Sequence, residues 1–490
     1  MLHLRSHLQG TRMVGTSAVS AQDGWSSRTA FLMAAVGAAV GLGNIWRFPT
    51  LAGENGGGAF VLVYVLCVAL IGMPMVLTEV LLGRAGGGHA DAVGSVADVA
   101  ERSGRSRMWG AFGLIEVIAA FFILSFYSVV AGWVLNYVFL SGGDVLSALL
   151  AGNPLSGAFA GQSQSDVTGM MGTLFGSPGR MITMHALFMA VTLSIVMLGV
   201  GGGIEKAATW LMPAFFVLLV LITIYGAFTG AFAEAVAFLF TPDFSALTPQ
   251  VMNEALGQAF FSLSLGSAAL ITYGSYVPAR VSLGSTAAMI AAADTGVAIL
   301  AGLMIFPIVF AAGLDPAAGP ALIFQSLPVA FQGMTGGALV GLAFFVLIFF
   351  AALTSSISLL EGPTAFAMSA LNLRRGPAAV LVAVLAFMVG VACALGYSTW
   401  SDVRPLAFWS IFANSDILDS IDGVTGKLML PLAGLGLAVF TGWRADRRLV
   451  EAESGLSGVS FVLWRGLVAW LAPVAVFLIL VFGLFPELLG

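Results

Sequence analysis

Charged residues are scarce in this chain of 490 residues. Lys, Arg, Asp and Glu together make up 9% of it, whereas 59% of the residues are hydrophobic and the mean hydropathy is +1.00. A soluble protein of this length needs a largely polar surface, so the composition excludes a soluble globule and places the chain in a bilayer. The net charge of −5 is small for the length and gives no reason to expect nucleic acid as a partner.

Cysteine and histidine are also rare. Cys67 and Cys393 both lie in apolar runs, so we expect buried free thiols rather than a disulfide. Of the four histidines, three stand at positions 3, 7 and 89, outside the apolar runs, and no pairing of a nucleophile with a base is visible. These absences argue against an enzyme.

Long apolar runs, in contrast, are abundant. Stretches of about 20 residues, each long enough to cross a bilayer as a helix, recur eleven times. Residues 1–24 before them are polar and lack the apolar core of a signal peptide, which predicts a cytosolic tail. The sequence therefore predicts an all-α membrane protein with eleven transmembrane helices, near residues 28–52, 58–82, 110–140, 182–200, 207–231, 252–278, 287–313, 337–370, 377–397, 416–443 and 461–486.

The distribution of basic residues favours one orientation of these spans. Lys and Arg concentrate in cytosolic loops of membrane proteins. With the N-terminus in the cytosol, only Arg180 and Arg404 fall outside, Arg47 and Lys427 lie within spans, and the odd number of spans puts the C-terminus outside. The basic residues on the cytosolic side are then Arg5, Arg12, Arg28, Arg84, Arg102, Arg105, Arg107, Lys206, Arg280, Arg374, Arg375, Arg444, Arg447, Arg448 and Arg465.

Two spans are interrupted by small residues. Residues 37–43 interrupt the first span with three glycines, and residues 262–267 interrupt the sixth, five spans later. For either span alone, glycines and serines that allow close helix packing are the simpler interpretation. Backbone groups freed inside a membrane need protein, water or a ligand as partners. A matching pair of broken helices is typical of inverted-repeat transporters, which bind substrate and ions at the midplane between the half-helices.

The residues around the first break resemble the signature of a known family. Gly41-Leu42-Gly43-Asn44, Trp46-Arg47-Phe48-Pro49 and residues 54–60 are similar to segments of the neurotransmitter:sodium symporters, the sodium-coupled amino-acid and amine transporters. Further matches are Gly72-Met73-Pro74 to Glu79, Gly83-Arg84, Tyr127 with Trp133, Phe260 to Gly266, Ala351 to Ser356, and Asp422 to Pro431.

The resemblance implies a fold. The expected architecture is the 5+5 inverted repeat of the leucine transporter, with broken helices 1 and 6. Its first repeat would comprise residues 25–231 (spans 1–5) and its second residues 252–443 (spans 6–10), with residues 461–490 forming span 11 and the C-terminus.

Two sodium ions are implied as well, since sodium prefers oxygen ligands and a broken helix supplies free carbonyls. The first site would use the Ala39 carbonyl, the Asn44 side chain, Ser262, the carboxylate of the substrate and a residue of the seventh span. We favour Asp294 for the last, although a shift of one residue would place Ala293 there. The alternative for Asp294 is a solvated position near the cytosolic end. Independence from chloride would rest on the charge of Asp294.

The second sodium site implied by the resemblance lies between the first and eighth spans. It would combine the carbonyls of Gly37, Val40 and Ala351 with the hydroxyls of Thr354 and Ser355. A Thr-Ser pair in an arbitrary membrane helix usually bonds only to its own helix, so this assignment depends on the resemblance.

Gly41 indicates the class of substrate. Amine transporters of the family carry an Asp at the matching position, so the glycine implies a substrate that brings its own carboxylate, an α-amino acid. Ser267 stands where the leucine transporter has a bulky Phe, which favours a large apolar or aromatic side chain unless neighbouring residues fill the space. The implied substrate residues are Ala39, Leu42, Gly43, Ile123, Tyr127, Phe261, Ser262, Ser264, Ser267, Ser355 and Leu359.

An external gate follows from the same resemblance. Arg47 and Asp422 correspond to the external ion pair, and Phe261 and Tyr127 would form the lid between this pair and the substrate. An Arg inside a span is costly without a partner, so other aspartates of the tenth span would replace Asp422 if that span were shifted by a turn.

The cytosolic gate departs from the family. Relatives commonly pair an N-terminal Arg with an Asp of the eighth span, but the matching residues here are Gln22 and Ser369. Trp25 remains as the plug, so closure would rely on packing or on other polar pairs, including those of Arg28, and we expect a less firmly locked cytosolic side. Glu79, a buried acid of the second span, is expected to bond to the backbone of the broken helices.

Together these features predict a sodium-driven symporter of hydrophobic or aromatic L-amino acids in a bacterial inner membrane, working by alternating access. Two alternatives stay open: a proton-coupled or sodium-independent amino-acid exchanger, and a non-transporting receptor or channel on the same scaffold. The expected partners are the amino acid, sodium ions and the lipid bilayer.

Overall fold

The part of the chain that the computed structural model describes, residues 24–319 and 321–489, has helices as its regular structure throughout. Within those residues, nine helices are long and apolar enough to cross a membrane: Gly58–Ala85, Arg107–Leu150, Pro178–Met197, Val200–Thr229, Leu283–Ala311, Gly337–Leu371, Arg375–Leu395, Ile417–Arg444 and Gly458–Leu484. A bent pair, Arg28–Ala39 with Gly43–Glu54, supplies a tenth span. The remaining expected span, near residues 252–278, falls on two shorter helices.

Most of the individual helices follow one another with short connections, and longer ones join α6 to α7 and α16 to α17. Up to the end of the fifth expected span, the chain forms α1 (Arg28–Ala39), α2 (Phe48–Glu54), α3 (Gly58–Cys67), α4 (Met73–Ala85), α5 (Ala92–Arg102), α6 (Gly110–Leu150), α7 (Gln164–Phe175), α8 (Pro178–Met197) and α9 (Glu205–Thr229), of which α5 and α7 lie between spans. The rest are α10 (Phe232–Phe240), α11 (Pro249–Ser262), α12 (Ala269–Ser275), α13 (Leu283–Ala311), α14 (Leu327–Gln332), α15 (Gly337–Leu371), α16 (Arg375–Leu395), α17 (Ile417–Val424), α18 (Leu430–Val439), α19 (Arg447–Ser454), α20 (Gly458–Gly466) and α21 (Ala472–Leu484). Turns of π-helix join α3 to α4 and α17 to α18.

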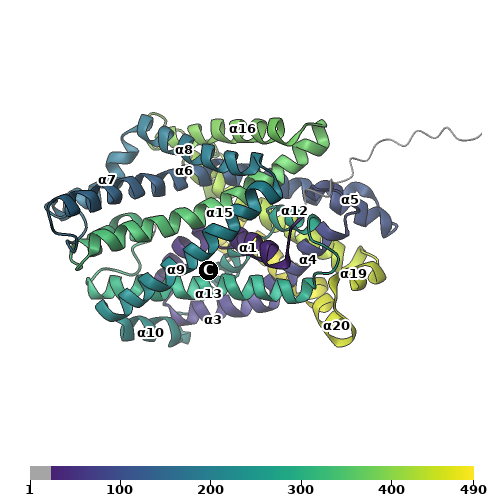
Figure 1. The fold of residues 1–490 in the computed structure, drawn as a ribbon. Coiled ribbons are helices and arrows are strands. Elements are labelled where there is room, and N and C mark those ends of the chain that lie inside the picture. Colours follow the sequence, from purple (N-terminus) through teal and green to yellow (C-terminus); the bar gives the residue numbers. More distant parts are fainter. Residues whose placement is uncertain (1–23, 320, 490) are drawn as a thin grey trace, which may run out of the picture.

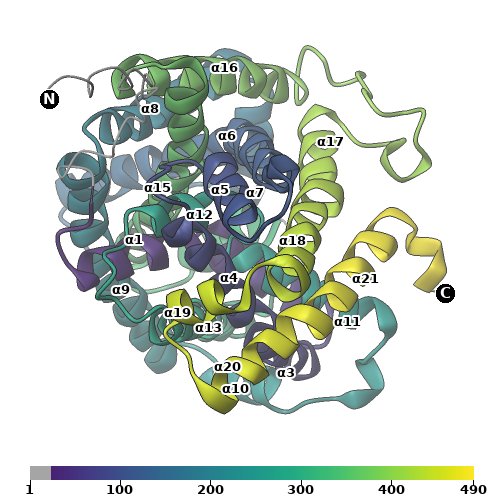
Figure 2. The same ribbon diagram turned by 90° about the vertical axis from the view of Figure 1, so that its right-hand side faces the viewer.

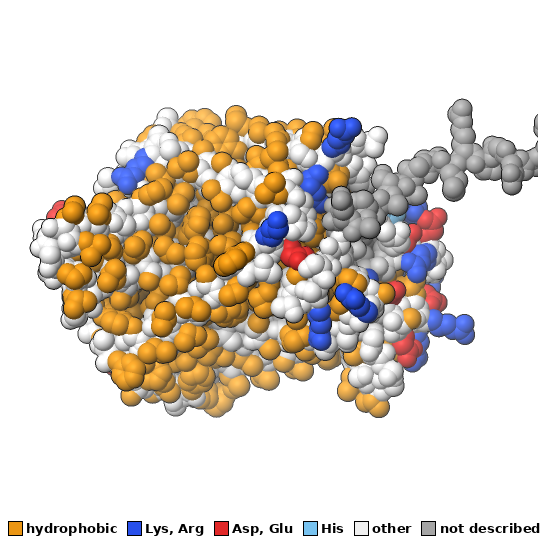
Figure 3. Space-filling model, viewed as in Figure 1, with side chains coloured by type: hydrophobic (Ala, Val, Ile, Leu, Met, Phe, Trp, Pro, Cys, Tyr) orange, Lys and Arg blue, Asp and Glu red, His pale blue; other side chains and the backbone are white. Residues whose placement is uncertain are grey.

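The long helices run side by side, with the short helices α1, α4 and α12 near the centre of the bundle (Figures 1 and 2). On the face shown in Figure 3, hydrophobic side chains cover the sides of the bundle. Charged side chains gather at the end that holds α5 and α19. A hydrophobic band with one strongly charged rim is the surface that a bilayer requires.

The first break lies where the sequence predicts it. Helix α1 ends at Ala39, Val40 is extended with a ψ of 105°, and the chain becomes helical again at Gly43 after a bend of 50°. Gly41 lies inside this break, where a Cβ would collide with the Ser355 hydroxyl. The glycine is therefore required by the close approach of α15 rather than by a positive φ.

The second break is longer and more strained. Helix α11 ends at Ser262 and α12 begins at Ala269. Three residues between them have positive φ: Ser264 at 55°, Gly266 at 77° and Ala268 at 60°. Because two of these are not glycine, the break stores about 1–3 kcal/mol at each, which the surrounding contacts must offset.

Three unusual residues of the spans have simple environments. Cys67 is half-buried and Cys393 is buried, and both are free thiols, as the sequence predicts. Lys427 is exposed, with its ammonium 5.7 Å from the centroid of the Phe412 ring. An exposed ammonium at the end of an apolar stem avoids burial of the charge.

Candidate functional site

Asn44, Ser262 and Asp294 come together between the two breaks. The Asn44 amide donates to the Ser262 hydroxyl at 2.9 Å and to the Asp294 carboxylate at 2.7 Å, and the Ser262 hydroxyl donates to the same carboxylate at 2.8 Å. The Tyr64 hydroxyl donates to it at 3.1 Å. Asp294 is fully buried, so it is neither displaced by Ala293 nor solvated at the end of α13.

The same cluster ties down the first break. The Asn44 side-chain oxygen accepts a hydrogen bond from the Gly41 amide at 3.0 Å, and the Gln258 side chain donates to the Gly43 carbonyl at 2.8 Å. Within the described residues, Asp294 forms no ion pair with Lys, Arg or His. A buried carboxylate balanced only by hydrogen bonds, among hydroxyl and amide oxygens, forms a suitable set of ligands for a hard cation.

A second set of oxygens lies between α1 and α15. The Ser355 hydroxyl is 3.4 Å from the Gly37 carbonyl and 3.3 Å from the Val40 carbonyl. The neighbouring Thr354 hydroxyl donates to the Ala351 carbonyl at 3.1 Å. All five residues expected at the second ion site are therefore in one place.

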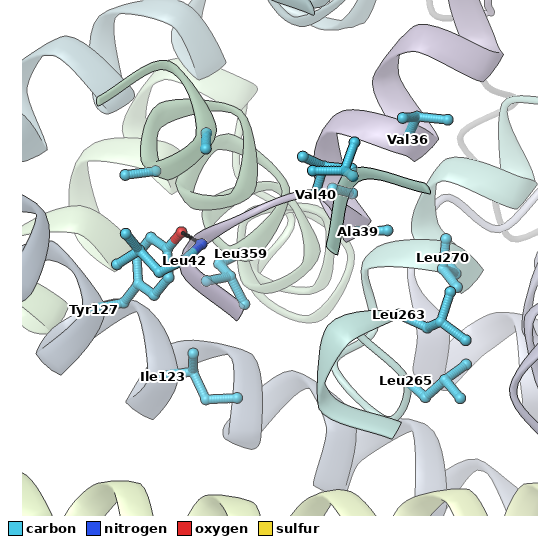
Figure 4. Packing of buried hydrophobic residues seen from close by; sticks show 14 of the residues in the cluster. Val36, Ala39, Val40, Leu42, Ile123, Tyr127, Leu263, Leu265, Leu270 and Leu359 are labelled. Carbon is cyan, nitrogen blue, oxygen red and sulfur yellow. Dashed lines mark hydrogen bonds between the residues drawn. The ribbon is translucent and has the colours of Figure 1, made fainter. Parts of the chain in front are cut away.

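Tyr127 links α6 to the first break. Its hydroxyl accepts a long hydrogen bond from the Leu42 amide, at 3.4 Å, drawn as a dashed line in Figure 4. Ile123, on the same helix, and Leu359 of α15 lie in the same part of the core (Figure 4). One polar hydroxyl among apolar side chains suits a ligand with a polar head and an apolar tail.

The second break contributes its own residues to this region. The Ser264 hydroxyl donates to the Ala38 carbonyl at 2.8 Å, and the Ser267 hydroxyl donates to the Ser264 carbonyl at 2.6 Å. The Phe261 ring packs against Gly43, where a Cβ would lie 3.3 Å from it. The two breaks are thus in direct contact, whereas the Ser267 hydroxyl is hydrogen-bonded within the second break.

One end of the site is partly open. Arg47 and Asp422 are both exposed and, among the described residues, form no ion pair with each other. The Arg47 guanidinium instead lies 4.7 Å from the centroid of the Phe261 ring.

The opposite end is closed around Trp25. This side chain is 3% exposed, and its indole donates to the Tyr273 carbonyl at 3.1 Å. Its backbone amide donates to the Tyr276 carbonyl at 3.4 Å. The next residue, Ser26, bonds through its amide (3.0 Å) and its hydroxyl to Glu205 at the start of α9. The segment before α1 is therefore fastened to α9 and α12.

The polar pair that relatives use at this end is absent. Gln22 lies outside the described residues, and Ser369 is exposed. Among the described residues, packing and other polar contacts hold this end together.

Those contacts include a buried ion pair. Arg375 binds Glu361 at 2.6 Å, and the Tyr276 hydroxyl donates to the same carboxylate at 2.9 Å. Arg28 donates to the Ser285 hydroxyl at 2.9 Å. Sequence reasoning missed the ion pair because its members come from the interior of α15 and the start of α16, with no motif at either position.

Two buried carboxylates hold the second break. Glu79 of α4 accepts from the Gly266 amide at 2.8 Å, which confirms the role expected for it. Glu116 of α6 accepts from the Ala268 amide at 3.1 Å. Sequence reasoning missed Glu116, although an acid within the third span was a usable signal. The neutral residues Tyr64 and Gln258 carried no such signal.

Comparison with known proteins gives consistent matches. The sequence pattern of the sodium:neurotransmitter symporter family matches residues 22–149 and 165–418. YhdH, an uncharacterised sodium-dependent transporter of Bacillus subtilis, is 34% identical over 93% of this chain and 96% of its own length. An uncharacterised sodium-dependent transporter of Haemophilus influenzae is 35% identical over 94% of this chain and 98% of its own. The crystal structure of MhsT in complex with L-phenylalanine is similar with a TM-score of 0.82 and 41% identity, covering 94% of this chain and 99% of MhsT.

Proposed function

The chain belongs to the sodium:neurotransmitter symporter family, and we propose that it couples uptake of hydrophobic or aromatic L-amino acids to the sodium gradient by alternating access. It is a multi-pass membrane transporter of the leucine-transporter fold and not an enzyme. The observation that carries the proposal is the buried cluster of Asn44, Ser262 and Asp294, a carboxylate without a cationic partner among the described residues, at the meeting point of the two breaks.

The first sodium would bind at this cluster. Asp294 offers a full negative charge, and Ser262 and the Ala39 carbonyl offer neutral oxygens. Rotation of the Asn44 amide about its last bond would turn its oxygen toward the ion, since the two ends of that group are nearly the same size. The substrate carboxylate would complete the ligands, which makes sodium binding and substrate binding mutually favourable.

The second sodium would bind between α1 and α15. The carbonyls of Gly37, Val40 and Ala351 and the hydroxyls of Thr354 and Ser355 supply five neutral oxygens, a set typical of a monovalent hard cation. Binding there would fix the first break against α15. A ligand shifts a conformational equilibrium only by binding one state better, and this site exists only when the two helices are close.

An amino acid fits the substrate region better than an amine. Gly41 leaves no carboxylate to pair an amine, so the carboxylate of the substrate would face the amides of Leu42 and Gly43 and the Tyr127 hydroxyl. Ser267 leaves room for a large side chain between the breaks. MhsT, crystallised with L-phenylalanine, supports an apolar or aromatic substrate.

The proposed setting is a bacterial inner membrane with the N-terminus in the cytosol and the C-terminus outside. The charged end at α5 and α19 would then face the cytosol, as the excess of basic residues there requires. Trp25 would close the cytosolic side, while Arg47 and Asp422 would lie on the external side without a bridging contact. The described conformation would therefore be closed inward.

Two other functions use the same scaffold. A proton-coupled or sodium-independent exchanger would not need both oxygen sets, and a receptor or channel would not accumulate substrate. Sodium dependence separates the first from a symporter, and saturable uptake with counterflow separates the second.

The test is uptake of labelled tryptophan and leucine into proteoliposomes holding the purified protein, with sodium or choline outside. We expect accumulation only in sodium, inhibited best by aromatic amino acids. In Asp294→Asn, the half-saturating sodium concentration should rise at least about tenfold, since a tenfold loss of affinity corresponds to about 1.4 kcal/mol of lost attraction.

The matched control is Glu101→Gln, which removes an exposed acid of α5 far from the breaks. It should leave the sodium dependence unchanged. Equal accumulation in choline and sodium would overturn sodium coupling, and an Asp294→Asn variant with the original sodium dependence would overturn the first site.

A further inference from the structure

Glu79 and Glu116 form a carboxyl pair for which the sodium mechanism has no use. Both are fully buried, and they accept hydrogen bonds from backbone amides two residues apart, Gly266 and Ala268. One oxygen of each carboxylate accepts the hydrogen bond from the amide. Within the described residues, the second oxygen of each is buried and has no hydrogen-bond partner.

Within the described residues, no positive charge balances the pair, because neither Glu79 nor Glu116 forms an ion pair with Lys, Arg or His. Several ionisable side chains of the helices packed around them are engaged elsewhere. These are Arg84 of α4 with Glu453, Asp98 with Arg102 in α5, His185 of α8 with the Phe387 carbonyl, Asp294 of α13 with Asn44, Ser262 and Tyr64, and Glu361 of α15 with Arg375 and Tyr276.

Two ionised carboxylates in this position would be expensive. An unpaired charge within a membrane protein costs several kcal/mol, and a second like charge adds repulsion. A metal cation would need about six oxygen ligands, whereas the pair leaves two oxygens free. A single proton suffices, because it removes one charge and gives one free oxygen a hydrogen to donate while both bonds to the amides remain.

We propose that Glu79 and Glu116 together bind one proton. The pair holds this proton while it is hydrogen-bonded to the second break, and it loses the proton when the break moves away. The two amides stand at the start of α12, the half-helix whose other end packs on Trp25. Opening of the Trp25 end displaces α12, and this removes the backbone donors and changes the charge balance of the pair. The equilibrium between closed and open states is therefore linked to pH, independently of either sodium site.

The direct test is infrared spectroscopy of the purified full-length protein. The carbonyl stretch of a protonated carboxyl should be present at neutral pH and should disappear on alkalinisation. Difference spectra should show its loss in Glu116→Gln and in Glu79→Gln, but not in Glu101→Gln. Absence of such a band from the wild-type protein at every pH, or spectra of both pair variants that match the wild type, would overturn the proposal.

Labelling of a cysteine gives a second readout that needs no transport. Ala34 lines a cavity of about 10 Å³ with Thr354 and with Tyr273 of α12, whose carbonyl accepts from the Trp25 indole. In Ala34→Cys, with both native cysteines replaced by Ala, opening that releases one proton shifts the open fraction about tenfold per pH unit. Thiol reactivity itself changes with pH, and this change is expected in every variant. Adding Glu116→Gln should abolish the remaining pH dependence of the labelling. An unchanged pH dependence in the double variant would contradict the linkage. Because neither measurement uses sodium or an amino acid, failure here is distinct from failure of the proposed symport.

Discussion

At the scale of single residues, we propose that Ser267 sets how much space the second break leaves for a substrate. The residue is 2% exposed, its hydroxyl donates to the Ser264 carbonyl, and its side chain is small. Ser267→Phe should fill that space. A mismatch of one methylene in a pocket is worth about 1–3 kcal/mol, so tryptophan should lose at least about tenfold in apparent affinity relative to leucine. Competition of both amino acids with labelled leucine uptake measures the ratio.

Ser267→Ala is the matched control for volume. It removes the hydroxyl without adding a ring, so the preference between tryptophan and leucine should stay as in the unmodified chain. If Ser267→Phe kept the original preference while still transporting leucine, the position would not set the size of the substrate site.

The residues of the candidate site were recognisable in the sequence to different degrees. Asn44 and Ser262 could be named from the family resemblance, because both stand in segments that match it. Asp294 could be named only with an uncertainty of one residue, because helical periodicity alone does not fix rotation within a uniformly apolar span; its contacts with Asn44 and Tyr64 remove that uncertainty. Gln258 could not be found, since a neutral side chain bonded to a backbone carbonyl leaves no pattern.

At the scale of helices, the ion pair between Arg375 and Glu361 fastens α16 to α15. The side chain of Glu361 is fully buried and that of Arg375 is 15% exposed. Arg375→Ala would leave the carboxylate buried without its cation, which costs about 3–5 kcal/mol. We expect a clear drop in the temperature of thermal unfolding of the detergent-solubilised protein.

Arg374→Ala is the control, because Arg374 is exposed and adjacent in sequence. It should change the free energy of unfolding by no more than about 0.5 kcal/mol. Adding Glu361→Gln to Arg375→Ala should recover part of the loss, because the uncompensated charge is then removed. Equal stability of the two single Arg variants would show that the pair contributes nothing to the stability of the fold.

Both broken helices could be predicted, because hydrocarbon penalises free backbone groups and small residues in a span therefore mark a break. The length of the second break could not. Positive φ at Ser264 and Ala268 is unfavourable for non-glycine residues, so sequence preferences favour continuing the helix sooner. The amide bonds to Glu79 and Glu116 bring in tertiary contacts from α4 and α6 that a local pattern does not contain.

At the scale of the whole molecule, the composition was sufficient to predict a helical membrane bundle, and the family signature supplied its topology. The conformation could not be read from the sequence. Which end is closed depends on small differences between contacts such as those of Trp25 with α12 and of Ser26 with Glu205. These contacts join segments about 180 to 250 residues apart, so only the folded chain reveals them.

Sodium should strengthen the closed state at the Trp25 end, because the oxygens proposed for the second site converge only when α1 lies against α15. If sodium binds the closed form alone, a concentration ten times its dissociation constant raises the ratio of closed to open protein about tenfold. Labelling of Ala34→Cys, in the background without native cysteines, should slow accordingly when potassium is replaced by sodium. Met108→Cys, at a position that is 81% exposed beyond α5, should react at the same rate in both salts.

Trp25→Ala should raise labelling of Ala34→Cys in sodium, because the side chain that fills this end is removed. If sodium left the labelling of Ala34→Cys unchanged while accelerating uptake, its effect would lie in substrate affinity rather than in closure of this end, and the second site would not join α1 to α15 as proposed.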